Sequence, residues 1–181
     1  MSVIIDKSDR DPNGYQLTTE LLVEEGRQQV FDFFADAFQL ETITPPWLHF
    51  SVRSARTMEM RAGTQIAYKL RLHGLPIRWR SKISNWDPPF QFVDEQVRGP
   101  YRYWHHLHTF DEVDGGTLVR DSVHYAVPFG FITHPLLVRR DLTKIFNHRR
   151  DTMSRLFTPV ACDGAVIATD DRGAGTDNGD H

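Results

Sequence analysis

The sequence has little cysteine and no long apolar run. Its single cysteine, Cys162, cannot form an internal disulfide or a thiolate metal cluster, so neither kind of stabilised fold is expected. No stretch approaches 18 consecutive apolar residues, and the first residues carry acidic side chains where a secretion signal needs basic ones. We therefore expect a cytoplasmic protein without stable membrane insertion.

A marked excess of one charge is also missing. The net charge is −3 at pH 7 and the basic and acidic residues are interleaved, so no nucleic-acid partner is expected. The chain contains no G-x-S-x-G motif and no glycine-rich phosphate loop, and Cys162 lies outside the segment expected to fold. These absences argue against serine and cysteine hydrolases and against nucleotide-dependent enzymes.

The length and composition fit one globular domain. The chain has 181 residues, of which 40% are hydrophobic and 12% aromatic, enough for one sizeable core. Residues 1–13 are charged, and residues 159–181 are rich in Gly, Asp and Ala and lack aromatic side chains. We predict a flexible N-terminus over 1–13, a folded domain over 14–158 and a disordered tail over 159–181.

A strand and two short helices are predicted first. Residues 15–23 have the character of a strand, and the segment QQVFDFFADAF then places Val30, Phe34 and Phe38 at helical spacing. The Pro45-Pro46 pair ends a second short helix and restricts Thr44 to extended backbone. The two helices should therefore separate the first and second strands of the domain.

Six segments rich in β-branched and aromatic residues follow between Trp47 and Val127. Turn sequences such as His73-Gly74, Asp87-Pro88-Pro89 and Gly115-Gly116 separate them, a spacing that predicts antiparallel hairpins. In the segment TQIAYKLRLH the apolar and polar residues alternate, so the sheet should be covered on one face only.

A long amphipathic helix over 134–157 is predicted to cover that face. Thr133 is its expected N-cap and Pro135 lies in its first turn. Its apolar stripe consists of Val138, Leu142, Ile145, Phe146, Met153 and Leu156. The predicted fold class is α+β, with a curved antiparallel sheet of about seven strands wrapped around the C-terminal helix and two short helices between strands 1 and 2.

Three stretches resemble a bacterial subgroup of the SRPBCC, or START-like, superfamily, whose members are often described as ligand-binding or polyketide cyclase/dehydrase-like. The stretches are VFDFFADAFQLETITPP, GTQIAYKLRLHGLPIRWRSKISNWDPPFQFVDEQVRGPYRYWHHLHTF and GTLVRDSVHYAVPFG, and the likeness extends over residues 15–158. One departure is Gln39, where a small Asn is expected. The resemblance implies a helix-grip fold with a long cavity between sheet and helix. Relatives of this kind bind lipids, polyketides, sterols or plant hormones, and some catalyse aldol cyclisation or dehydration.

Candidate catalytic residues follow from strand alternation. In the segment YRYWHHLHTF, Trp104, His106 and His108 share one face, which the large rings mark as the inner one. A carboxylate beside an imidazole in a dry cavity suits acid–base chemistry, so Asp94 with His106, or Asp121 with His108, are candidate pairs. The alternative is that these polar groups only satisfy one another inside the fold.

Arg149 falls on the apolar stripe of the last helix. It either pairs with a carboxylate and faces a ligand, or extends its guanidinium to water at the helix flank; the sequence leaves both open. The candidate catalytic set is thus His106, His108, Asp94 and Arg149.

The expected ligand-binding residues are mainly large rings on the inner face of the sheet and helix. The set consists of Trp47, Tyr68, Trp79, Phe92, Gln96, Trp104, Asp121, Tyr125, Phe129 and Phe146. Residues 129–134, FGFITH, are expected to form a mobile gate where the last strand meets the helix.

Four functional hypotheses remain open from the sequence. The leading one is a carrier or sensor of a hydrophobic small molecule, and the second is a cofactor-free cyclase or dehydratase. A third is a cupin-like metalloenzyme in which His106-x-His108 binds a divalent ion together with Glu112 or Asp121, although no cofactor or metal is assigned. A fourth is an interaction module that uses a sheet edge, in which case side chains should fill the cavity. The oligomeric state is not set by the sequence.

Overall fold

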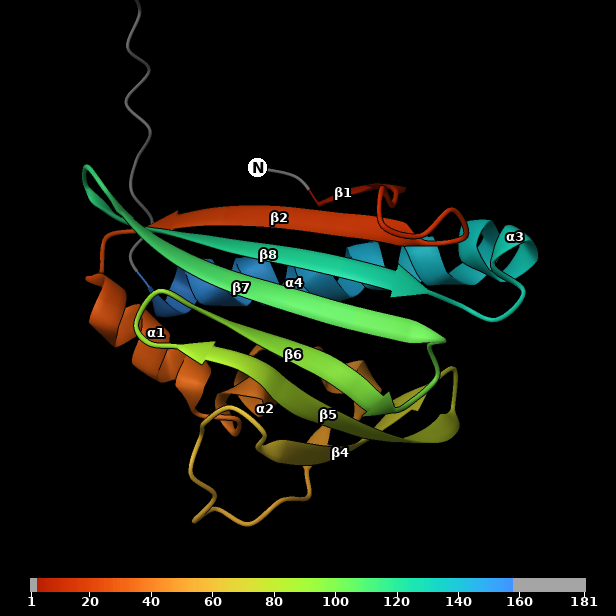
Figure 1. The fold of residues 1–181 in the computed structure, drawn as a ribbon, viewed down its shortest axis with the longest axis horizontal. Coiled ribbons are helices and arrows are strands. Elements are labelled where there is room, and N and C mark those ends of the chain that lie inside the picture. The colour runs from red at the N-terminus through yellow and green to blue at the C-terminus, as the bar shows by residue number, and fades with distance from the viewer. Residues whose placement is uncertain (1–2, 158–181) are drawn as a thin grey trace, which may run out of the picture.

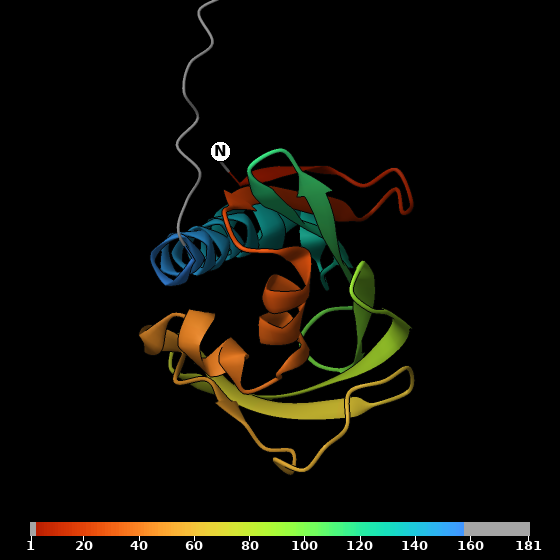
Figure 2. The same ribbon diagram turned by 90° about the vertical axis from the view of Figure 1, so that its left-hand side faces the viewer.

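The computed structural model describes residues 3–157, apart from the side chains of residues 131 and 132. One eight-stranded antiparallel sheet curves around the helices (Figures 1 and 2), in the spatial order β1-β2-β8-β7-β6-β5-β4-β3. The elements are β1 (Ile4–Lys7), β2 (Tyr15–Val23), α1 (Arg27–Ala35), α2 (Gln39–Ile43), η1 (Pro46–Leu48), β3 (Ser51–Val52), β4 (Gln65–Leu72), β5 (Leu75–Asp87), β6 (Gln91–Arg98), β7 (Tyr103–Val113), β8 (Gly116–Ala126), α3 (Gly130–Thr133), η2 (His134–Val138) and α4 (Arg139–Leu156). The predicted helix-grip α+β fold is confirmed, including the six strands β3 to β8.

The N-terminus differs from the prediction. Within the segment predicted to be flexible, Ile4–Lys7 form β1 and pair antiparallel with β2, and Ile5 is buried. Two apolar residues are too few to show the alternation of a strand, and the pairing partner is supplied by the edge of β2. The predicted tail over 159–181, with Cys162, lies outside the described residues.

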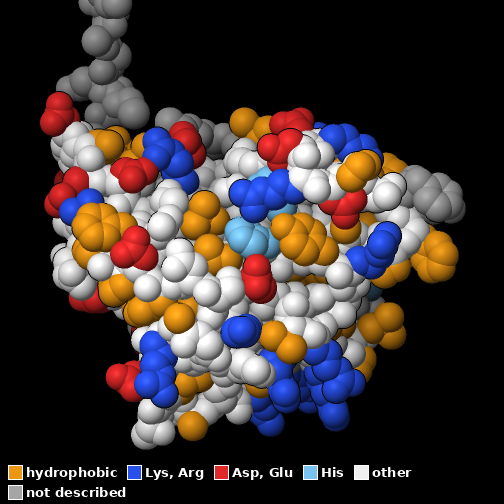
Figure 3. Space-filling view, in the orientation of Figure 1, with side chains coloured by type: hydrophobic (Ala, Val, Ile, Leu, Met, Phe, Trp, Pro, Cys, Tyr) orange, Lys and Arg blue, Asp and Glu red, His pale blue; other side chains and the backbone are white. Residues whose placement is uncertain are grey.

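The sheet has an inner face buried against the helices and an outer face exposed to solvent. On β7, Trp104, His106, His108 and Phe110 are buried in alternation, as the predicted inner face requires. The outer face carries a mixture of charged, apolar and histidine side chains, with Lys and Arg gathered over β4 and β5 (Figure 3). Thus one face of each strand is available to build a site.

The last helix begins earlier than predicted. It starts at Gly130, and Thr133 does not act as the N-cap, since its hydroxyl donates to the carbonyl oxygens of Pro128 (2.9 Å) and Phe129 (3.2 Å). Residues 134–138 form a π-helical turn in which the N–H of Arg139 donates to the carbonyl of His134. Pro135 explains the widened turn, because its ring lacks an N–H and clashes with an α-helical carbonyl one turn back.

Helix α4 closes the inner side of the sheet. It buries Leu142, Phe146 and Met153, whereas Leu156 at its end is half exposed. In Figure 2 the helix lies beneath β2 and β8, beside α1 and α2. None of the helices within residues 3–157 has the length and apolar character needed to cross a membrane.

Two apolar clusters form the core. One centres on Phe110, whose ring lies 5.4 Å from that of Phe31 and 5.1 Å from that of Phe34. The other contains Trp104 and Phe146. The polar side chains described below lie where these two clusters meet.

A buried histidine fastens the start of the last helix to the sheet. The ring of His134 stacks on Tyr15 with the centroids 3.3 Å apart, and its Nε2 shares a hydrogen bond of 2.8 Å with the hydroxyl of Tyr125. Burial lowers the pKa of His134 to about 4, and the positive charges of Arg139 and Lys7 act in the same direction. The folded protein therefore keeps this imidazole neutral.

The stability of the protein should consequently fall in mild acid. In the unfolded chain His134 is protonated below its ordinary pKa of 6.5, whereas in the folded chain it stays neutral until about pH 4. Its contribution to the free energy of unfolding is therefore fully present above pH 6.5 and is lost as the pH falls from 6.5 towards 4. Between pH 7 and pH 5 this residue accounts for about 2 kcal/mol. In urea unfolding, wild type should lose about 2 kcal/mol more over this interval than His134→Gln. Equal losses in the two proteins would contradict the assignment.

Candidate functional site

A cavity of about 200 Å³ lies between the inner face of the sheet and the helices. Strands β4 to β7 contribute one wall, and the segment from α1 to the loop after η1, together with α4, contributes the other. Most of the lining is aliphatic or aromatic, including Leu40, Ile66, Trp79 and Phe146. Side chains do not fill the space, which contradicts the filled interior expected of a sheet-edge interaction module.

Four polar side chains on three adjacent strands form the Asp–His cluster, which consists of Asp94 on β6, His106 and His108 on β7, and Asp121 on β8. The sheet register places Asp94 opposite His106 and His108 opposite Asp121. Three of these side chains line the cavity, and Asp121 lies behind the two imidazoles. The cluster therefore forms a polar patch on a largely apolar wall.

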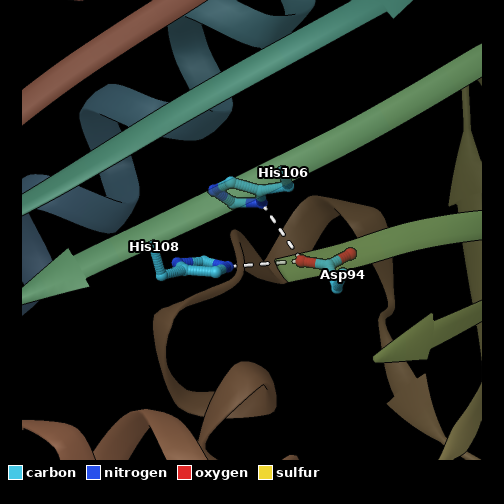
Figure 4. A group of neighbouring side chains, drawn as sticks. All are labelled: Asp94, His106 and His108. Atoms are coloured by element: carbon cyan, nitrogen blue, oxygen red, sulfur yellow. Dashed lines mark hydrogen bonds and ion pairs between the residues drawn. The ribbon is translucent and has the colours of Figure 1, made fainter. Parts of the chain in front are cut away.

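Each carboxylate in the cluster is close to both imidazoles. Asp94 Oδ2 lies 3.2 Å from His108 Nε2, which donates to it, and 3.4 Å from His106 Nδ1 (Figure 4). Asp121 Oδ1 accepts from His106 Nε2 at 3.0 Å and lies 2.7 Å from His108 Nδ1, at an angle unsuited to a hydrogen bond. The two rings lie side by side, with centroids 3.8 Å apart.

Arg149 on α4 completes the polar group. Its Nη2 lies 3.6 Å from Asp121 Oδ1, and its guanidinium stacks over Phe34 with 5.2 Å to the ring centroid. The side chain is 11% exposed and lines the cavity. The structure thus places Arg149 on the buried face and not at the solvent-facing flank of the helix. Its Nε and Nη2 have no hydrogen-bond partner among the described residues.

Burial and mutual contact set the protonation of the cluster. Burial would raise the pKa of both carboxyls, but hydrogen bonds from the imidazoles and the charge of Arg149 hold the pKa of Asp94 below its usual value and that of Asp121 well below it. For His106, burial and the neighbouring His108 lower the pKa to about 4. For His108, burial is outweighed by the close carboxylates of Asp121 and Asp94, which raise its pKa.

The protonation states balance the charges inside the fold. Two carboxylates face one protonated imidazole, His108, and one guanidinium, Arg149, while His106 stays neutral with its proton on Nε2. A buried group of ions is tolerated only when its charges are paired. Without a bound ion, the cluster satisfies this condition by itself.

Three members of the cluster could also hold a metal ion. Asp94, His106 and His108 each offer a ligand atom, and these atoms lie within 4.8 Å of one another. The third ligands suggested from the sequence were Glu112 and Asp121. Glu112 is 63% exposed and pairs with Arg27 at 2.9 Å, away from the cavity, and Asp121 faces the far nitrogens of the imidazoles.

The predicted ligand-binding residues divide into two groups. Five of them line the cavity, namely Tyr68, Trp79, Phe92, Trp104 and Phe146. Asp121 belongs to the cluster and lines a smaller recess on its other side. The remaining four lie outside the cavity lining.

Each of those four has a different environment. Trp47 is 54% exposed and packs edge-on against His148. Gln96 binds the backbone of Tyr101 in the loop after β6, and Tyr125 is fully buried in its bond to His134. Phe129, in the segment predicted to be a gate, is 76% exposed with a left-handed backbone (φ 54°).

The sequence analysis missed part of the cavity wall. Residues from the helical segment and the loops complete it, including Phe33, Phe34, Ile43, Phe50 and Tyr101. The aromatic face of α1 was predicted, but nothing in its spacing tells a core position from a cavity position. Tyr68 also has a polar partner that the sequence does not reveal, because the hydroxyl of Ser81 donates to its oxygen at 3.1 Å.

The curved sheet, the long C-terminal helix and the cavity between them define a helix-grip protein. The family model described as polyketide cyclase / dehydrase and lipid transport matches residues 26–154, and the chain belongs to this family of the SRPBCC superfamily. The search among curated proteins returned no match.

Solved structures with the same fold come from several organisms. Protein Ms6760 from Mycobacterium smegmatis has a TM-score of 0.61 at 19% identity, with 85% of this chain and 96% of that chain covered. Protein CV1439 from Chromobacterium violaceum has a TM-score of 0.62 at 11% identity, covering 80% and 99%. Ginseng major latex-like protein 151 from Panax ginseng has a TM-score of 0.60 at 12% identity, covering 81% and 99%. These likenesses extend to the fold alone.

Proposed function

We propose that this protein binds a small, largely apolar molecule in its cavity and acts as a carrier or sensor of it. The observation that carries the proposal is an unfilled, mostly apolar space inside an otherwise packed domain. Empty apolar space is costly, because the atoms around it lose packing contacts, and a ligand restores them.

The size of the cavity limits the ligand. An engineered apolar cavity of about 150 Å³ accommodates benzene. At about 200 Å³, the cavity suits a molecule of one or two rings, or a short branched chain, better than a long lipid. The aromatic wall, with Trp79, Phe92 and Trp104, favours a flat ring by stacking.

The Asp–His cluster favours a ligand with a polar group at one end. Ligand sites commonly combine an apolar lining with a few polar groups that fix orientation. Here Asp94, His106 and His108 supply such groups on one side of the cavity. A hydroxyl or carbonyl on an apolar body would match this wall.

Native mass spectrometry of the purified protein tests the proposal. The expected result is a chain that carries an added mass, which denaturing extraction releases as an apolar organic molecule. An empty chain that also fails to bind any member of a panel of one- and two-ring phenols and ketones would overturn the proposal.

A cavity-filling variant gives a second test. Leu70 lines the cavity on β4, and its neighbour Lys69 points to the exposed face. Leu70→Trp should weaken binding of the extracted molecule at least about tenfold, because the added ring occupies ligand space. Lys69→Trp is the matched control and should bind as wild type does. Calorimetric titration measures both, and equal affinities in the two variants would place the ligand elsewhere.

A second function is supported by the same wall. His106, His108, Asp94 and Arg149 all line the cavity, so a bound molecule would meet an imidazole, a carboxylate and a guanidinium together. This arrangement suits a cyclase or dehydratase that moves a proton and stabilises an enolate. Product formation from the extracted molecule distinguishes this enzyme from a carrier, which returns its ligand unchanged.

A further inference from the structure

We propose that Asp94, His106 and His108 form a binding site for one divalent first-row transition metal ion, such as Zn²⁺ or Fe²⁺, with open coordination positions facing the cavity. Two imidazoles and one carboxylate are a donor set that these ions accept. The site itself does not depend on the proposed function. That the open positions receive an oxygen atom of the cavity's ligand does rest on it.

The ligand atoms already stand at coordination distances from one another. Bonds of about 2.0–2.2 Å at tetrahedral or octahedral angles separate neighbouring ligand atoms by about 2.8–3.6 Å. Asp94 Oδ2 lies 3.4 Å from His106 Nδ1 and 3.2 Å from His108 Nε2, and all three atoms lie within 4.8 Å of one another. In Figure 4 both imidazoles turn a nitrogen toward the Asp94 carboxylate.

Asp121 supplies the outer support that such a site needs. Metal-bound imidazoles usually donate their other N–H to a carboxylate, which fixes the ring and its tautomer. Asp121 Oδ1 lies 3.0 Å from His106 Nε2 and 2.7 Å from His108 Nδ1, and these are the two nitrogens that face away from Asp94. One carboxylate thus faces both rings from behind: it accepts a hydrogen bond from His106 and lies at ion-pair distance from His108. The other nitrogen of each ring remains directed at Asp94.

The position of the site explains what the ion would do. Asp94, His106 and His108 are contributed by rigid neighbouring strands and line the cavity. With neutral imidazoles, the two carboxylates and Arg149 carry a net charge of −1, and a divalent ion changes it to +1. An anionic oxygen, from hydroxide or from a phenolate or enolate of the ligand, would neutralise the site. The metal would therefore select an apolar molecule that carries an acidic oxygen.

Titration with Co²⁺ tests the site directly. Chelator-treated protein should bind one Co²⁺ per chain with a visible d–d absorption that excess Zn²⁺ removes. Two exchangeable, paramagnetically shifted N–H signals are expected in the proton NMR spectrum, one from the nitrogen of each imidazole that faces Asp121. No saturable Co²⁺ absorption would overturn the proposal and leave the four residues as an ion-free network.

Variants locate the ion within the sheet. Asp94→Asn and His108→Gln should each weaken Co²⁺ binding at least about tenfold. His105→Gln is the matched control, since His105 lies on the same strand but on the outer face, near Glu95. It should bind Co²⁺ as wild type does, and loss of binding in this variant alone would move the ion to the outer face and overturn the proposal.

If Asp94→Asn and His108→Gln both unfold, the number of shifted N–H signals in the wild-type protein tests the metal site instead. Two signals support the site, and fewer contradict it. The outcome is separable from that of the proposed function. An apolar ligand without a metal site leaves the carrier proposal standing, whereas a metal site in a protein that binds no apolar molecule removes the carrier proposal alone.

Discussion

Asp121→Ala is expected to lower the free energy of unfolding by about 3–5 kcal/mol. The carboxylate is buried and faces His106, His108 and Arg149 at 3.0, 2.7 and 3.6 Å. Its removal leaves two buried positive charges, on Arg149 and His108, with only the carboxylate of Asp94 to balance them. Uncompensated charge of this kind is among the largest single-site penalties in a folded protein. Urea unfolding at pH 7 with a chelator present measures the loss.

A double-mutant cycle separates charge pairing from lost packing. In the Arg149→Met background, Asp121→Ala should cost about 1–3 kcal/mol less than it does in wild type, because the stranded guanidinium is gone. The methionine keeps most of the packing against Phe34, over which the guanidinium stacks. Additive effects would show that Arg149 and Asp121 do not interact in solution.

Gly116→Ala is expected to cost more than about 3 kcal/mol, because strain and a steric clash add. Gly116 has a φ of 148°, and a Cβ atom there would lie 1.9 Å from the backbone carbonyl oxygen of Val23. That carbonyl belongs to backbone and cannot turn aside as a flexible side chain would. The first pairs between β2 and β8 would have to separate.

Gly63→Ala is the matched control for this substitution. Gly63 also has a positive φ, of 92°, but a Cβ atom there meets nothing within 4 Å. The expected cost is about 1–2 kcal/mol, from backbone strain alone. If urea unfolding gives the two variants equal stability, the close approach at Val23 is not a constraint on the fold.

Strand alternation was sufficient to predict the inner face of the sheet. The period of two put Trp104, His106 and His108 on one side, and their burial confirms it. The pairs Asp94 with His106 and Asp121 with His108 also stand opposite each other in the register. The sequence could not reveal that each carboxylate reaches both rings, since that depends on strand twist and side-chain rotamers.

Other parts of the site depended on tertiary contacts that no local pattern contains. Whether Arg149 reaches the sheet or water is decided by the distance between α4 and β8. Trp47 and Phe129 carry large rings but lie outside the cavity, because aromatic content alone does not fix the direction of a side chain in a loop. The strand β1 likewise forms only because β2 offers it an edge.

The pairing of β2 with β8 has a kinetic consequence. Residues 15–23 pair with residues 117–125. The first long strand, β2, therefore cannot pair with β8 until nearly the whole domain has been synthesised or brought together. The chain loses the conformational entropy of closing this long loop before the strand pairing stabilises it. Pairing of β2 with β8 is therefore slower than formation of the local hairpins. On a ribosome, the hairpins of β4 to β7 would emerge with their apolar faces uncovered until β8 and α4 follow. The interval before release of the C-terminal helix is therefore when this chain is most exposed to aggregation.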